Sequence, residues 1–250
     1  MRFTYDDEMR LRATIAYDGT DFHGFQRQTN ARSVQGELEV AFGRICGHAV
    51  TVVGAGRTDA GVHATGQVIA FDVAWRHTLD DLQRAANSEL PDDVAVVDLA
   101  PCEPGFHPRY DARSRVYEYR ITETSVRRPL TRRYEWQVNL RLDRAAIQRA
   151  TQWLIGEHDF AAFGSAPYGD VTVRHVMRAE WNGEDGQWRF TIEANAFLFR
   201  MVRRIVATLV RVGSGQLDPD EVKEILTNRD ARRVKGAAPA CGLCLTQVNY

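Results

Sequence analysis

The sequence contains almost no lysine and no long apolar run. Only Lys223 and Lys235 are lysines among its 32 basic residues, so the other 30 are arginines. No stretch approaches the roughly 18 apolar residues of a membrane-spanning helix, and "MRFTYDDEMRLRATIAY" lacks the apolar core of a signal peptide. We therefore expect a cytoplasmic protein with no membrane partner.

Residue patterns typical of metal sites are also scarce. The four cysteines provide one C-x-x-C pair, Cys241 and Cys244, with no second pair at the spacing of metal ligands. Cys244 lies in "GLCLTQVNY", whose alternation is typical of a strand, so a buried thiol is favoured over a zinc ligand. The seven histidines form no H-E-x-x-H motif. We expect no metal site.

Arginine is clustered, although the net charge of the 250 residues is only −1. Residues 105–133 contain eight arginines and three acidic residues, and residues 194–217 contain four arginines and no acidic residue. Because the planar guanidinium suits bidentate contact with phosphate, this segregation favours a nucleic-acid-binding surface. The alternative is that the arginine content reflects genomic base composition.

The order of predicted elements in the first half is βαββαβ, the ferredoxin-like unit. "LRATIAY", "AVTVVGA", "QVIAFDV" and "DVAVVDL" are typical of strands. Helical spacing follows Ser33, a suitable N-cap, and recurs in "TLDDLQRAANSEL". The loop between the second and third of these strands contains Asp59, and a loop that joins strands is a good place to present a functional side chain.

A similar order begins again after "APCEPGFHPRYDA". We expect strands in "SRVYEYRI" and "LCLTQVNY", a hairpin around "GEDG", a helix in "LDRAAIQRATQWLI" and a helix over Leu198 to Val212. "YEWQV" is an added strand, and an added helix opens with Asp218 and Pro219 in cap order. The prediction is an α+β protein with two ferredoxin-like halves, residues 1–104 and 105–250, whose mainly antiparallel sheets flank a central cleft.

The glycine-rich stretch "GAGRTDAGVHATG" matches neither of two familiar phosphate loops. Val62 and His63 stand where a P-loop requires Lys and Ser or Thr, and Asp59 stands where a dinucleotide fingerprint requires its third glycine. Asp59 has two interpretations: a turn residue that caps its own backbone, or a functional carboxylate. His63 is expected to be structural, hydrogen-bonding the loop.

Six segments together resemble the TruA family of tRNA pseudouridine synthases, in the family's order and across nearly the whole chain. They are "YDGTDFHGFQRQ", "SVQGELEVAF", "GRTDAGVHATGQV", "FHPRYDARSRVYEYRI", "ANAFLFRMVRRIVATL" and "APACGLCLTQVNY". "GRTDAGVHA" is the most specific. Phe25 stands where the family usually has Trp, and Ala207 where it often has Gly; neither difference affects the chemistry that the family implies.

The resemblance implies a homodimeric isomerase that converts uridine to pseudouridine at positions 38 to 40 of the tRNA anticodon stem-loop. It implies no cofactor, because breaking N1–C1′ and forming C5–C1′ involves no net redox or hydrolytic change. It does not indicate whether the carboxylate attacks ribose C1′ or uracil C6, or which uridine is preferred. In this resemblance Asp59 matches the catalytic carboxylate, and Arg203 matches the basic residue beside that carboxylate. Tyr117 matches the active-site tyrosine, and Arg57 matches the arginine two residues before the carboxylate. Leu243 or Leu245 matches a leucine that packs near the uracil.

Several alternatives remain at this point. Helical periodicity places Arg203 and Arg204 at the two borders of the apolar stripe, about equally far from its centre, and only the family's "MVR" match selects Arg203. Tyr117 could be a core aromatic of its strand rather than a platform for the flipped base. A non-catalytic RNA-binding protein shares the βαββαβ order but would need an RNP1 pattern, and a small-molecule regulator would leave the arginine clusters unexplained.

Overall fold

The computed structural model describes residues 8–166, 169–184 and 186–250. The chain forms two compact units, one of Met1–Arg113 with Leu245–Tyr250 and the other of Ser114–Cys244. The division therefore lies nine residues after the expected boundary at 104, and the last six residues belong to the first unit instead of the second. Residues 1–7 and Asp185 of the expected hairpin turn lie outside the described residues.

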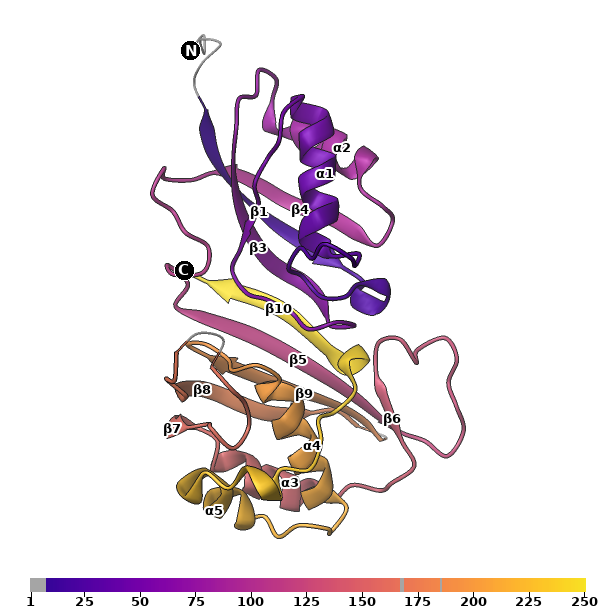
Figure 1. Cartoon of the computed structure of the whole chain (residues 1–250). Helices are drawn as coiled ribbons and strands as arrows, with labels where there is room; N and C mark the ends of the chain where they lie inside the picture. The colour runs from indigo at the N-terminus through magenta and orange to yellow at the C-terminus, as the bar shows by residue number, and fades with distance from the viewer. Residues whose placement is uncertain (1–7, 167–168, 185) are drawn as a thin grey trace. The chain divides into compact units, whose positions relative to one another are not determined.

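The first unit has the expected βαββαβ order (Figure 1). β1 pairs antiparallel with both β3 and β4, and the short β2 pairs with β3. Its elements are β1 (Met9–Tyr17), η1 (Gly19–Asp21), α1 (Val34–Cys46), β2 (Val53–Gly54), β3 (His63–Val73), α2 (Leu79–Glu89) and β4 (Val94–Pro101).

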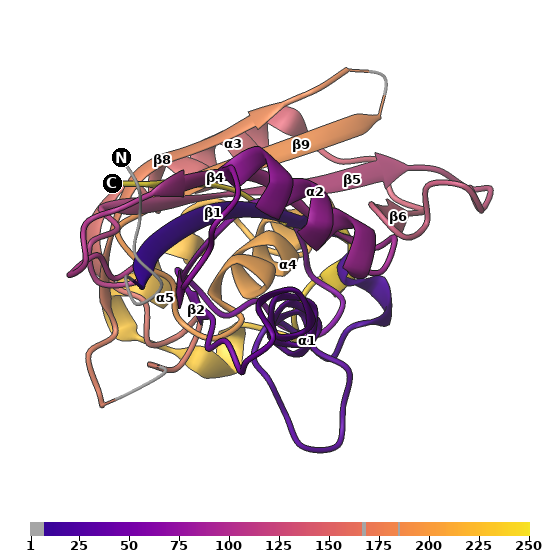
Figure 2. The same ribbon diagram turned by 90° about the horizontal axis from the view of Figure 1, so that it is seen from above.

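Both helices of this unit begin at side-chain caps. The Ser33 hydroxyl accepts a hydrogen bond from Gly36 N–H at 3.3 Å, as expected for α1, and Thr78 with Asp81 forms a capping box at the start of α2. α1 buries its apolar stripe against the sheet, where Phe42 stacks on Phe71 of β3 with ring centroids 4.2 Å apart. Figure 2 shows α1 end-on. Each fully buried aromatic of this kind contributes about 1.5–3 kcal/mol.

β2 is much shorter than the "AVTVVGA" strand expected from the sequence. The backbone groups of Val52, which a longer ladder would need, are bound instead by side chains of α1. Gln35 Nε2 donates to Val52 O at 3.0 Å, and Val52 N–H donates to Glu39 Oε1 at 3.2 Å. Val50 and Val52 are both buried, but the strand pattern of "AVTVVGA" contains no sign of this competition for the Val52 backbone.

The second unit is also α+β and mainly antiparallel. β5 pairs with β9, β9 with β8 and β8 with β7, all antiparallel, and the added β6 runs parallel to β5. Its elements are β5 (Ser114–Glu123), β6 (Trp136–Val138), α3 (Arg144–Gln152), β7 (Gly156–Asp159), β8 (Val173–Asn182), β9 (Gln187–Ala194), α4 (Met201–Gly213), α5 (Glu221–Asn228), η2 (Ala231–Arg233), η3 (Ala240–Gly242) and the start of β10 (Leu243–Asn249).

Three features of this unit differ from the sequence prediction. β7, with the polar sequence "GEHD", was not predicted because it has no apolar alternation. α4 begins at Met201 rather than Leu198, since Arg200 has left-handed backbone geometry at the N-cap. α5 begins at Glu221 with Asp220 at its N-cap, while Asp218 accepts a hydrogen bond from Asp220 N–H at 2.9 Å in the preceding turn.

α3 and α4 pack closely where Gly213 meets Ile147. A Cβ added to Gly213 would lie 2.5 Å from Ile147 Cδ1, so a larger residue here would force the Ile147 side chain to move. The buried Thr151 hydroxyl accepts a hydrogen bond from Trp181 Nε1 at 3.1 Å, which satisfies the indole where β8 meets α3. In the described part of the chain, no helix is both long enough and apolar enough to cross a membrane.

A glycine on β3 provides a test of how β10 joins the first unit. A Cβ on Gly66 would lie 2.0 Å from Thr246 O, a backbone atom of β10. We expect Gly66→Ala to destabilise the protein by at least about 2 kcal/mol, because the backbone itself would have to move. The melting temperature should fall by about 4 °C or more. Gly105→Ala is the control, because its added Cβ would meet nothing within 4 Å. Equal melting temperatures for the two variants would contradict this packing.

Candidate active site

The loop between β2 and β3 presents Arg57 and Asp59 on either side of a buried threonine. Thr58 is 6% exposed, whereas Arg57 is exposed and Asp59 is half-buried. The strand-joining position expected for Asp59 is confirmed. With Thr58 turned inward, its two neighbours are left nearer the surface of the unit, where they can meet a ligand.

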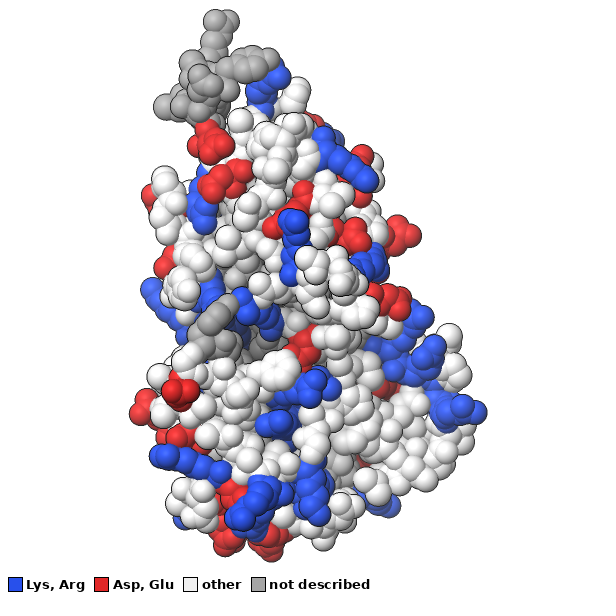
Figure 3. Space-filling model, in the orientation of Figure 1, with Lys and Arg blue, Asp and Glu red and all other residues white. Residues whose placement is uncertain are grey.

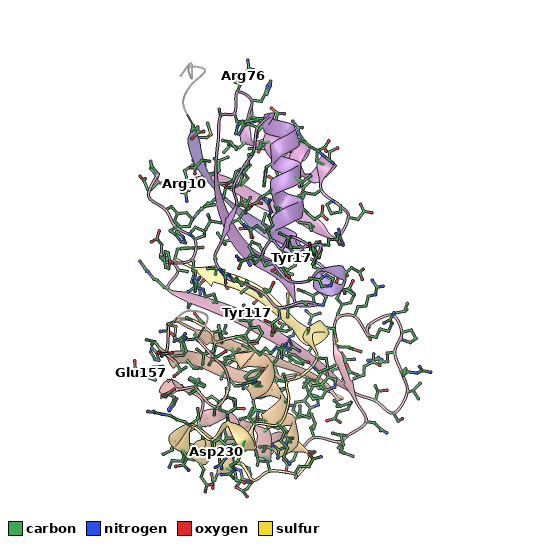
Figure 4. All side chains as sticks on the ribbon, in the orientation of Figure 1. Arg10, Tyr17, Arg76, Tyr117, Glu157 and Asp230 are labelled. Atoms are coloured by element: carbon green, nitrogen blue, oxygen red, sulfur yellow. The ribbon has the colours of Figure 1, made fainter. Side chains whose placement is uncertain are left out.

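Thr58 is held by the segment that follows β1. Its hydroxyl lies 2.8 Å from the hydroxyl of Tyr17, and both groups are buried. Its carbonyl oxygen accepts a hydrogen bond from Phe25 N–H at 3.1 Å. Tyr17, at the end of β1, is labelled in Figure 4. The residue next to Asp59 is therefore fixed through both its side chain and its backbone.

Two glycines permit this contact between segments. Gly24 has a φ of 97°, and a Cβ there would lie 2.7 Å from Thr58 O. At Gly19 a Cβ would lie 2.0 Å from Val62 O, at the other end of the loop. Larger residues at either position would push the loop away, and with it the Asp59 carboxylate.

A turn follows Asp59. Val62 N–H donates to Asp59 O at 3.1 Å, Gly61 has a φ of 76°, and Gly61 N–H donates to Phe22 O at 3.2 Å. A backbone turn is thus present at Asp59, and the hydrogen bond from Val62 N–H is accepted by the Asp59 backbone oxygen. A backbone turn at this residue and a functional carboxylate are compatible.

His63 and Gln67 support the loop from β3. His63 is 7% exposed, and its Nδ1 accepts a hydrogen bond from Gly19 N–H at 3.0 Å, so the expected structural role is confirmed. Gln67 is fully buried and donates from Nε2 to Gly56 O at 2.9 Å.

Arg32 braces the segment that contacts the loop. Its two terminal nitrogens bind the Asp93 carboxylate at 2.7 and 2.9 Å, and its guanidinium lies over the Phe22 ring, 4.1 Å from the centroid. Hydrogen bonding to Asp93 raises the pKa of Arg32 above its usual value. Hydrogen bonds thus connect the Asp59 loop to the segment after β1, and that segment to the turn that contains Asp93.

In the second unit, Tyr117 and Tyr119 occupy different environments on β5. Tyr117, labelled in Figure 4, is 9% exposed, and its ring meets Phe197 edge-on with centroids 5.0 Å apart. Tyr119 is fully buried and donates to Pro239 O at 2.7 Å, and burial raises the pKa of its hydroxyl well above the usual value. Tyr119 is a core residue, whereas Tyr117 lies at the margin of the core.

Arg203 binds the chain that leads into β10. Its Nε donates to Ala238 O at 2.7 Å, and its backbone oxygen accepts from Ala238 N–H at 2.9 Å. Arg203 and Arg204 are both half-buried, as the periodicity predicted, but this contact with residue 238 belongs to Arg203. Leu243, in the second unit, is 6% exposed, and Leu245, in the first, is fully buried.

The structure therefore divides the predicted site residues between two units. Arg57, Asp59 and Leu245 belong to the first unit, and Tyr117, Arg203 and Leu243 to the second. The segment "YDGTDFHGF" contributes to the family resemblance, but its residues had no predicted role. In the structure its residues Tyr17, Gly19 and Gly24 contact the Asp59 loop. Their spacing could have suggested a structural role, but it could not have identified the Asp59 loop as their partner.

Exposed arginines gather between β5 and β6. Four of them project from this segment, where Figure 3 shows basic side chains on the surface: Arg127, Arg128, Arg132 and Arg133. Among the described residues, no group of three or more His, Cys, Asp and Glu side chains is placed to hold a metal ion. Cys241 and Cys244 are both half-buried, and burial raises the pKa of the Cys241 thiol.

Comparison with known proteins places the chain in a family. A family model described as tRNA pseudouridine synthase matches residues 13–111 and 150–250. The tRNA pseudouridine synthase A of Brevibacillus brevis is 43% identical over 244 residues, covering 96% of this chain and 99% of that protein. The protein of the same name from a Thermotoga species is 40% identical, and the match covers 96% of this chain and 99% of that protein. The one from Roseiflexus castenholzii is 44% identical, and the match covers 94% of this chain and 88% of that protein. The chain therefore belongs to the family of tRNA pseudouridine synthases, isomerases that convert uridine in tRNA to pseudouridine.

Proposed function

We propose that this protein isomerises uridines 38 to 40 in the anticodon stem-loop of tRNA and that Asp59 is its nucleophile. The observation that carries this proposal is the Asp59 loop, in which Thr58 is bound by Tyr17 and Phe25 while the carboxylate next to it stays near the surface. A carboxylate on a rigid support can attack repeatedly from one direction, which a mobile side chain cannot.

The reaction is balanced without a cofactor. The N1–C1′ bond breaks, the uracil turns, and a C5–C1′ bond forms; the proton lost from C5 is matched by one gained at N1. An ionised Asp59 can assist by adding to ribose C1′ or to uracil C6, and it is released unchanged in either case. Incubating the protein with an unmodified tRNA transcript and analysing the nucleosides for pseudouridine tests the activity, and mapping the modified position tests the choice of stem-loop.

The other residues act on the same uridine in this proposal. A base stacked in a stem-loop must be turned out at an energetic cost of a few kcal/mol, which contacts with the flipped base offset. Tyr117, at the margin of its core, provides the ring, and Leu243 or Leu245 packs near the uracil. Arg57, exposed beside Thr58, holds the vacated space or a phosphate.

Arg203 is proposed as the cation that acts with Asp59, its planar fork orienting the carboxylate. Support comes from the hydrogen bond that Arg203 Nε donates to Ala238 O, which fixes the direction of the side chain. We further propose a homodimer in which both subunits contact each tRNA, in the cytoplasm, where such a substrate is present.

Replacing the carboxylate of Asp59 tests the nucleophile. Asp59→Asn is nearly isosteric but a poor nucleophile, so it should abolish pseudouridine formation while tRNA affinity stays within a few-fold of wild type. Asp92→Asn, an exposed aspartate elsewhere in the first unit, should behave as wild type. An Asp59→Asn rate above one tenth of the wild-type rate would show that this carboxylate is not the nucleophile.

A second prediction compares adjacent arginines of α4. Arg203→Ala should lower the single-turnover rate at saturating enzyme by at least about 100-fold, in the range expected for losing an electrostatic or orienting group. Arg203→Lys should recover only part of the rate, because lysine keeps the charge but not the bidentate geometry. Arg204→Ala should weaken tRNA binding modestly or have no effect. A severe defect in Arg204→Ala beside a near-normal Arg203→Ala would reverse the assignment.

The arginine clusters predict a steep dependence of tRNA affinity on salt. Binding that neutralises phosphates releases counterions, so the logarithm of the affinity should fall linearly with the logarithm of salt concentration. Arg127→Gln and Arg132→Gln, in the exposed segment between β5 and β6, should each reduce the slope by about 0.7–0.9. Arg149→Gln, an exposed residue of α3, serves as the control. A slope that neither variant changes would exclude this segment from the interface.

A further inference from the structure

The short segment between β9 and α4 is fixed at both ends. At its start, Asn195 Oδ1 accepts hydrogen bonds from His175 N–H at 3.0 Å and from Ala196 N–H at 2.8 Å. At its end, Phe199 forms an isolated β-bridge with Ser165, in which Phe199 N–H donates to Ser165 O at 3.0 Å. The backbone of this segment is therefore fixed, and with it the positions from which its side chains extend.

Close packing within this segment separates buried from exposed side chains. A Cβ on Gly164 would lie 2.6 Å from Leu198 Cβ and 2.7 Å from Phe199 O, so the segment lies directly on that glycine. Leu198 is 4% exposed, whereas Phe199 is 51% exposed. Phe197, two residues before Phe199, is half-buried, and its ring contacts Tyr117.

Arg200 follows in a conformation that costs free energy. Its φ is 60°, in the left-handed region that favours glycine, and its side chain forms no cap for α4. The guanidinium lies over the exposed Phe199 ring, 4.9 Å from the centroid. Residues 194–217 around this pair include four arginines and no acidic residue. Folding alone does not require arginine here, since glycine would adopt this backbone without strain.

We propose that Phe199 and Arg200 bind a nucleotide of the substrate tRNA beside the target uridine. Phe199 stacks on the unpaired base, and Arg200 contacts its phosphate. An exposed aromatic ring next to a guanidinium in an acid-free segment matches the chemistry of single-stranded RNA, which proteins bind by stacking and by charge. The identification of the RNA as tRNA rests on the proposed function. The contact itself is inferred from Phe199 and Arg200 alone.

Substitutions at Phe199 separate stacking from general packing. Phe199→Ala and Phe199→Leu should each raise the Kd for an unmodified tRNA transcript at least about tenfold, as for other stacking aromatics. The turnover rate at saturating tRNA should stay within a few-fold, and Phe199→Trp should bind within about threefold of wild type. Ile155→Ala, at a residue that is 40% exposed in the same unit, should leave Kd unchanged.

Arg200 has a matched control in Arg229, which also has a positive φ, 53°, at the end of α5. Glycine removes the backbone strain at either site, so Arg200→Gly should not lower the melting temperature. Arg229→Gly loses the ion pair with Asp159, but the Asp159 carboxylate keeps its hydrogen bonds from Thr172 and Ala161, so this variant should be similarly stable. Arg200→Gly should nevertheless raise the Kd for tRNA at least about threefold, and Arg229→Gly should not.

The outcomes distinguish this inference from the proposed function. A Kd within twofold of wild type for Phe199→Ala and Phe199→Leu would overturn the inference, even if Asp59→Asn abolishes activity as proposed. Loss of self-association in these variants, measured by light scattering, with unchanged tRNA affinity would assign the patch to a contact between copies of the chain and would also overturn it. Failure of the wild-type protein to form pseudouridine would overturn the proposed function, while the affinities would still decide whether Phe199 contacts RNA.

Discussion

The contact between Thr58 and the segment after β1 is the constraint on which the arrangement of the first unit depends. Tyr17 binds the threonine side chain and Phe25 its backbone, and the glycines at positions 19 and 24 let the two segments approach without a Cβ between them. The Arg32–Asp93 pair then holds the outer side of that segment. A buried threonine, bound through its hydroxyl and its carbonyl oxygen, explains how a glycine-rich loop can be fixed at the residue next to Asp59.

In the second unit, hydrogen bonds to backbone groups fix Arg203 in a similar way. Arg203 both donates to and accepts from residue 238, and Tyr119 donates to Pro239 just beyond it. The chain that enters β10 is thereby attached to α4 and β5. The chain belongs to the tRNA pseudouridine synthase family, and we propose that each support positions one reacting group of that isomerisation.

Departures from the predicted elements occur where side chains compete for the backbone. β2 is short because Gln35 and Glu39 of α1 bind the Val52 backbone. α4 starts late because residue 200 adopts a positive φ between a bridge to Ser165 and the first helical turn. Alternation and helical periodicity describe which side chains prefer burial, so neither pattern contains information about such competition.

The sequence by itself determined the α+β class, the βαββαβ order of the first unit and the position of Asp59 between two strands, because these follow from local periodicity. It also determined the Ser33 cap through capping chemistry and the family through the order of its motifs. Only the tertiary structure decided that the last six residues join the first unit, that Thr58 is bound by Tyr17 and Phe25, and that Arg203 rather than Arg204 contacts residue 238. Each of these is a contact between residues at least 33 positions apart in the chain. The direction of one side chain toward such a partner is set by packing, which no local pattern specifies.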